Sequence, residues 1–108
     1  MNIELTYLYR DAANYKNWGT VVFSNTQGMT LSDIESAARR GLIDGAWFVV
    51  QNVGLPDLRP EDWDDEIDHD WHELHSLSET DAEADDPQGR DIAEFLQALQ
   101  VSLPAPLS

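Results

Sequence analysis

The chain has 108 residues, 42% of them hydrophobic, which is enough for one folded domain with a single core. Its formal net charge of −15, with only six basic residues, argues against direct binding to nucleic acids or anionic membranes. The lack of cysteine excludes disulfides and thiolate metal sites. No apolar run resembles a signal peptide or a membrane span, so we expect a cytoplasmic protein.

Two strands are predicted at the start of the chain. Apolar and polar side chains alternate from Ile3 to Arg10, which is typical of a half-buried strand. A polar, asparagine-rich stretch follows, and residues Gly19–Ser24 are then β-branched and apolar. This pattern predicts a hairpin whose two strands are joined by a long loop.

A helix and a third strand are predicted in the middle of the chain. Thr30 and Asp33 are spaced as in a capping box, and the apolar stripe that follows predicts a helix over Leu31–Arg40. Gly41 is expected to end this helix in the left-handed conformation. The continuous apolar run Ala46–Val50 predicts a central strand covered on both faces.

The second half of the chain contains a strongly acidic segment. Fourteen of the twenty-one carboxylates and all three histidines lie between Asp57 and Asp86. Inside it, residues 71–78 alternate and predict a fourth strand, whereas residues 80–86 are expected to be a solvated linker. Asp86 and Pro87 are then expected to cap and begin a last helix, whose apolar positions are Ile92, Phe95, Leu96 and Leu99.

These elements predict an α+β fold in the order β-β-α-β-β-α, with a mainly antiparallel four-stranded sheet and two helices. The folded domain is expected over residues 1–101, with a flexible C-terminal tail over residues 102–108.

A ligand site is the first functional hypothesis. Tyrosines and two of the six cations gather between residues 7 and 16, where a guanidinium fork, an ammonium group and aromatic rings suit a small anionic, nucleotide-like ligand. The alternative is that these residues form ion pairs and packing contacts. With two residues of the fourth strand added, the proposed set is Tyr9, Arg10, Asp11, Asn14, Tyr15, Lys16, His72 and Glu73.

A divalent metal site is the second hypothesis, formed by His69, His72 and His75. On a strand, however, His69, Glu73 and His75 share one face and His72 points to the other. On a helix, His69, His72 and Glu73 would converge instead. Packed or hydrogen-bonded histidines are the alternative, and we expect no resident cofactor and no catalytic set.

The third hypothesis is a protein-binding surface made by the acidic run. Carboxylates at every second residue lie about 3 Å apart on a helix, close to the roughly 3.4 Å of DNA phosphates, but nearly 7 Å apart on an extended chain. Prolines at both ends disfavour a long helix, so DNA mimicry would require the segment to fold back on itself. The residues proposed to contact a basic partner are Asp62, Asp64, Asp65, Glu66, Asp68 and Asp70.

Three strings, YRDAANYK at 9–16, VGLP at 53–56 and DHDWHEL at 68–74, together resemble a family of small bacterial and phage proteins of unassigned function. The resemblance covers about residues 5–80 of the sequence. It implies a bacterial, plasmid or phage setting. It also implies that the first and third strings form one site where they lie side by side.

From these observations we expect a non-enzymatic interaction protein that binds a basic surface of a protein partner, as an inhibitor, an antitoxin-like protein or a counter-defence factor would. The alternative is a small-ligand or metal-binding module built from the first and third strings. An uncovered edge strand also leaves a homodimer open.

Overall fold

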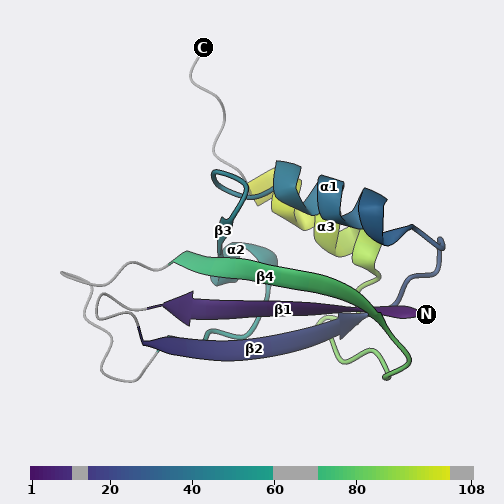
Figure 1. The fold of residues 1–108 in the computed structure, drawn as a ribbon, viewed down its shortest axis with the longest axis horizontal. Helices are drawn as coiled ribbons and strands as arrows, with labels where there is room; N and C mark the ends of the chain where they lie inside the picture. The colour runs from purple at the N-terminus through teal and green to yellow at the C-terminus, as the bar shows by residue number, and fades with distance from the viewer. Residues whose placement is uncertain (11–14, 60–70, 103–108) are drawn as a thin grey trace, which may run out of the picture.

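A computed structural model describes residues 1–10, 15–59 and 71–102 of the protein. Within these residues the chain forms four strands and three helices (Figure 1). In chain order these are β1 (Asn2–Arg10), β2 (Lys16–Phe23), α1 (Leu31–Arg40), β3 (Trp47–Val49), α2 (Val50–Val53), β4 (Trp71–Thr80) and α3 (Ile92–Ser102).

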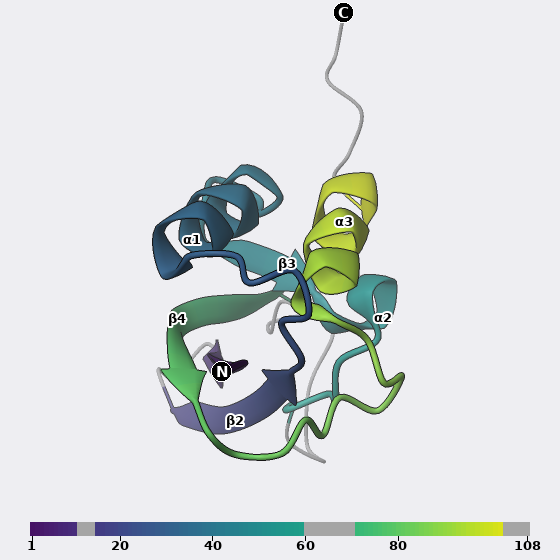
Figure 2. The same cartoon turned by 90° about the vertical axis from the view of Figure 1, so that its right-hand side faces the viewer.

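The four strands form one antiparallel sheet in the order β2-β1-β4-β3, with β1 and β4 at its centre. Figure 2 shows that the sheet is curled and that α1 and α3 lie on the same side of it. The α+β fold with a mainly antiparallel four-stranded sheet is therefore confirmed. None of the helices in the described part of the chain is long and apolar enough to cross a bilayer.

The core lies between the helices and the sheet face that we call the inner face. Alternate residues of β1 point into it, and Ile3, Leu5 and Tyr7 are at most 1% exposed. The helices contribute apolar side chains at helical spacing, such as Ile34 from α1 and Phe95 from α3. Both periodicities seen in the sequence thus meet in one core.

The third strand differs from its prediction. It has three residues instead of five and lies at the edge of the sheet, where it pairs only with β4. The prediction of a central strand covered on both faces is wrong, because Val50 already begins α2 and only Phe48 of the strand is buried. The hairpin loop is also shorter than expected, since β2 begins at Lys16 and pairs with β1 as far as Arg10.

Helix α1 has the predicted bounds, and Thr30 caps it by accepting a hydrogen bond from the backbone N–H of Asp33 at 3.2 Å. Gly41 follows it, but its φ of −90° and ψ of −1° are not left-handed, so that prediction is wrong. A Cβ atom on Gly41 would lie 2.8 Å from the Cβ of Leu99. Glycine is therefore required here by the close approach of α1 to α3 rather than by backbone conformation.

The last helix begins later than predicted. Asp91, not Asp86, caps α3, accepting the N–H of Ala93 at 3.2 Å, and its own N–H is bound by Glu94 at 3.2 Å. This reciprocal pair is a capping box. Asp91 also accepts hydrogen bonds from Ser24 and from the N–H of Thr26, which attaches the helix to the end of β2.

Asp86 is instead part of a buried ion pair. Its side chain is fully buried, and both its oxygens accept bonds from Arg90 at 3.0 Å. Arg90 also donates to the carbonyl oxygen of Val53 at 2.7 Å, so it joins the connection after β4 to α2. Burial raises the pKa of Asp86, but the hydrogen bonds and charge of Arg90 outweigh it and hold that pKa below its usual value. The expected solvated linker therefore ends in a buried anchor.

Candidate functional site

The helices pack on the inner face of the sheet, and the opposite face, here called the outer face, carries the candidate site. Successive strand residues point to opposite sides, so Leu8 and Arg10 point outward while Tyr7 and Tyr9 point inward. The strand register then places Trp47, Glu73, Leu8 and Trp18 in one row across β3, β4, β1 and β2. At about 4.8 Å per strand this row is about 14 Å long.

An ion pair crosses the two central strands next to this row. The guanidinium of Arg10 donates from Nε to Oε1 of Glu73 at 3.0 Å and from Nη2 to Oε2 at 3.4 Å. The two side chains are 38% and 26% exposed, so the pair lies at the surface. It joins residues that are 63 positions apart in the sequence.

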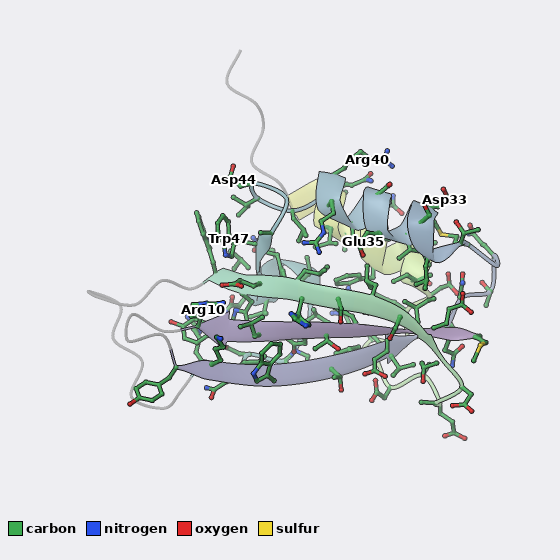
Figure 3. The ribbon with its side chains drawn as sticks, in the orientation of Figure 1. Arg10, Asp33, Glu35, Arg40, Asp44 and Trp47 are labelled. Carbon is green, nitrogen blue, oxygen red and sulfur yellow. The ribbon has the colours of Figure 1, made fainter. Side chains whose placement is uncertain are left out.

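Aromatic rings lie on both sides of this ion pair. On the β3 side, Trp47 and Trp71 stack with centroids 5.8 Å apart and an angle of 29° between their planes. On the β2 side, Trp18 meets His75 edge to face at 4.9 Å. Figure 3 labels Trp47 and Arg10, which lie towards the same end of the sheet, where β1 ends.

We call this surface the tryptophan face. Trp18 is 51% exposed and Trp71 is 38% exposed, so two large aromatic side chains present a substantial area to solvent. A buried indole ring stabilises the core, whereas a partly exposed ring can contact another molecule. The face consists of Arg10, Trp18, Trp47, Trp71, Glu73 and His75.

The structure brings some of the predicted ligand residues together and separates others. Arg10 and Glu73 are in contact, and Lys16 pairs with Arg10 in the register of β1 and β2. Tyr9 and His72, in contrast, are 1% and 0% exposed and point to the inner face. Tyr15, which is 75% exposed, lies directly before β2.

His72 occupies a buried aromatic environment. Its ring centroid lies 5.2 Å from that of Tyr9 and 6.1 Å from those of Tyr7 and Phe48. Its Nε2 accepts a hydrogen bond from the backbone N–H of Leu58 at 3.1 Å. A neutral imidazole that accepts at Nε2 carries its proton on Nδ1, so the fold selects one tautomer of this histidine.

The segment 55–59 closes the inner face at this end of the sheet. The hydroxyl of Tyr7 donates to the carbonyl oxygen of Pro56 at 2.7 Å, and the side chain of Asn17 donates to the carbonyl of Leu58 at 2.9 Å. Burial, with a smaller contribution from the charge of Asp57, raises the pKa of Tyr7 to about 12.

Asp57 lies beside His72, with Oδ1 at 3.6 Å from Nε2. Partial burial raises the pKa of Asp57, but the hydrogen bonds and charge of Arg59 hold it below its usual value. The Nε of Arg59 donates to both oxygens of Asp57 at 3.0 and 2.8 Å. This carboxylate is thus engaged within its own segment.

Other sequence-based hypotheses fall beyond the described residues. These residues are Asp11 and Asn14 of the ligand set, His69 of the metal set and all six acidic residues proposed for partner binding. Among residues 1–10, 15–59 and 71–102, no group of three potential ligands could hold a metal ion. His72 and His75 lie on opposite faces of β4, as strand alternation predicted. The predicted tail began at residue 102, but Ser102 is the last residue of α3, and residues 103–108 are outside the described part.

Three tryptophans of the site were not among the sequence-based site residues. For Trp71 the sequence did contain a signal, because it shares a face of the predicted fourth strand with Glu73. The order of the strands was not visible, and only that order brings Trp47 beside Trp71 and Trp18 beside His75.

A separate hollow of about 650 Å³ lies beside α2 and α3 and shares no residue with the tryptophan face. Its lining is rich in carboxamide side chains. It is formed by Asn52, Gln88, Arg90, Glu94, Gln97, Ala98 and Val101.

Comparison with known proteins gives no match: no protein-family model, no curated protein and no solved structure is similar to this chain.

Proposed function

We propose that this protein is a non-enzymatic interaction protein whose tryptophan face binds a basic surface of a protein partner. The gathering of Trp18, Trp47 and Trp71 on the sheet face opposite the helices carries this proposal. Tryptophan is enriched among the residues that contribute most to protein–protein binding, because a large rigid ring is buried at little entropic cost.

The charge of the chain supports a basic partner. A net charge of −15 attracts cations over long range and raises the rate of encounter with them. At short range, the faces of indole rings attract arginine and lysine side chains through cation–π interactions. Both terms favour the same partner, so such a protein would act by covering a basic functional surface, as an inhibitor, antitoxin or counter-defence factor does.

The small-anion alternative has less support. The guanidinium fork of Arg10 is occupied by both oxygens of Glu73, which is the geometry an anionic ligand would need. An anion would have to displace Glu73 inside a strongly negative field. The ion pair is therefore better suited to orient the surrounding side chains than to capture an anion.

Affinity capture tests the proposal. The tagged parent, a Trp18→Ala/Trp71→Ala double variant and a Val101→Ala control are each incubated with a bacterial lysate. Val101 is a matched control because it is apolar, 77% exposed and located on α3. We expect the parent and the control to retain a basic protein that the double variant loses.

The captured protein is then purified and titrated at increasing ionic strength. We expect its affinity to fall as salt screens the charges. The screening length is about 10 Å at 0.1 M salt and about 3 Å at 1 M, so exposed charges attract each other less as salt is added. Equal capture by the double variant, folded as judged by circular dichroism, would refute the role of the tryptophan face. An affinity that does not change with salt would refute the electrostatic part.

A further inference from the structure

No other strand of the described residues pairs with the outer edge of β2. In an antiparallel pair, alternate residues bond to the neighbouring strand and the others point away from it. The backbone N–H and carbonyl of Val22 point away from β1. The N–H donates to Oδ1 of Asp85 at 2.7 Å, and the carbonyl accepts from the N–H of Asp85 at 2.9 Å. By the same alternation, the backbone groups of Thr20, Trp18 and Lys16 also point away from the sheet.

Within the described residues, the open part of this edge runs over residues 16–20. Asp85 closes the edge at Val22 with its side-chain Oδ1 and its backbone N–H. Among the described residues, no backbone hydrogen bond to Thr20, Trp18 or Lys16 follows on this side. The other edge of the sheet is closed at Trp47, whose N–H and carbonyl both bond to Ile43 at 3.0 and 2.7 Å. Over the part of the chain that the structure describes, the β2 edge therefore offers a row of donors and acceptors without a backbone partner.

We infer that this edge of β2 binds an extended segment of the basic partner by strand addition. The inference rests on the proposed function and specifies how the partner is held. Five residues at about 3.4 Å each give an edge of about 17 Å, and each outward residue offers one donor and one acceptor to the added strand. Main-chain bonds of this kind provide affinity without requiring one particular sequence.

The surroundings of the edge specify the side chains of the added segment. Positions beside Trp18 lie on the outer face, where an indole ring favours a cation. Positions beside Gly19 lie on the inner side, where the Leu58 side chain occupies the space that a side chain at residue 19 would need, 3.0 Å from where its Cβ atom would be. The added strand therefore meets the apolar side chain of Leu58 on this side. A segment that alternates basic residues with β-branched apolar residues fits both sides.

Charge favours such a segment over a second copy of this chain. Asp85 lies at the end of the open edge, and two copies would bring net charges of −15 together. A basic strand is instead attracted, because its positive charges are brought close to a strongly negative protein. The occupant is therefore a basic partner segment.

The probe for this inference is a nine-residue peptide of alternating arginine and valine, titrated into the intact protein by calorimetry. A second peptide carries N-methyl groups on the residues whose N–H groups would face β2, which retains charge but removes the main-chain bonds. We expect N-methylation to weaken binding about a hundred-fold, because several main-chain hydrogen bonds are lost at once.

Two variants of Thr20 give the matching test on the protein. Thr20→Pro removes one outward N–H at an edge position, where proline is tolerated, whereas Thr20→Val retains the N–H and the branched side chain. We expect about ten-fold weaker binding for Thr20→Pro and less than two-fold for Thr20→Val. In the parent, the amide protons of Trp18 and Thr20 should exchange with solvent faster than those of Gly19 and Val21, and the peptide should protect them.

The outcomes separate this inference from the proposed function. If Trp71→Ala weakens binding but N-methylation and Thr20→Pro do not, the face binds the peptide and strand addition is refuted. If the peptide does not bind, a basic strand is not the occupant. If sedimentation shows a dimer that Thr20→Pro dissociates, a second copy occupies the edge and the inference is overturned. Loss of binding on both N-methylation and Thr20→Pro supports it.

Discussion

The guanidinium of Arg10 and the carboxylate of Glu73 form a two-point ion pair across the two central strands, with Nε 3.0 Å from Oε1. The pair joins the two sequence strings that were expected to form one site if they lay side by side. Both belong to the described residues, and both point to the outer face. The ion pair thus lies in the centre of the tryptophan face, between the Trp47–Trp71 stack and the Trp18–His75 contact.

A double-mutant cycle measures what this pair contributes to stability. Arg10→Ala, Glu73→Ala and the double variant are unfolded in urea beside the parent. We expect a coupling energy of no more than about 1 kcal/mol, because both side chains are partly exposed and solvent screens their attraction. The coupling should decrease further in 1 M NaCl. A salt-insensitive coupling of several kcal/mol would contradict this account and indicate a buried pair.

Much of the fold followed from the sequence because its signals are local. Alternation in β1 and the capping pair Thr30–Asp33 of α1 depend only on neighbouring residues, and both were confirmed. The position of β3 was not local information. A continuous apolar run suits either a central strand or an edge strand that leads into a helix, and the contacts of the whole chain decide between them.

The site was predictable in part for the same reason. Arg10 and Glu73 could be selected because each belongs to a distinctive string. Trp71 lies in the same string as Glu73 but was not selected, and Trp18 and Trp47 lie in none of the three strings. Gly41 shows a related limit. Its place after a helix suggested a left-handed cap, whereas in the structure a Cβ atom at this position would lie only 2.8 Å from the Cβ of Leu99, a residue of a different helix. Long-range packing of this kind has no sequence pattern that a single chain reveals.

The buried pair of Asp86 and Arg90 should contribute strongly to stability. Asp86→Asn leaves the 10% exposed guanidinium of Arg90 without its counter-charge. We expect the free energy of unfolding in urea to fall by about 3 kcal/mol, as when one partner of a buried ion pair is removed. Asp81→Asn is the control, since Asp81 is exposed in the same connection, and it should change stability by less than about 0.5 kcal/mol. Equal losses of unfolding free energy in the two variants would show that the ion pair of Asp86 and Arg90 does not stabilise the fold.

The effect of Asp86→Asn should depend on pH in one direction. The pKa of Asp86 is lower in the folded protein than in the unfolded chain, so its stabilisation is present above about pH 4 and is lost as the pH falls through the folded value. The difference in unfolding free energy between the parent and Asp86→Asn should therefore be full at pH 6 and shrink towards pH 2. Comparing the two proteins largely cancels the general effect of the high net charge. A difference that stays constant down to pH 2 would contradict the lowered pKa.

Tyr7 gives the opposite pH dependence. Its hydroxyl donates to Pro56 and its pKa is raised to about 12, so its stabilisation is present below about pH 10 and is lost as the pH rises towards 12. Tyr7→Phe should lower the free energy of unfolding by about 1 kcal/mol at pH 7, because a buried hydrogen bond is removed.

Above pH 10 the parent should lose stability that Tyr7→Phe does not lose, by an amount on the order of 2 kcal/mol. Tyr15→Phe is the control, because Tyr15 is 75% exposed and should leave the alkaline loss unchanged. Thermal unfolding followed by circular dichroism between pH 9 and 12 measures all three proteins. If the parent and Tyr7→Phe decline in parallel over this range, the phenol of Tyr7 ionises as readily in the folded protein as in the unfolded chain, and burial does not raise its pKa.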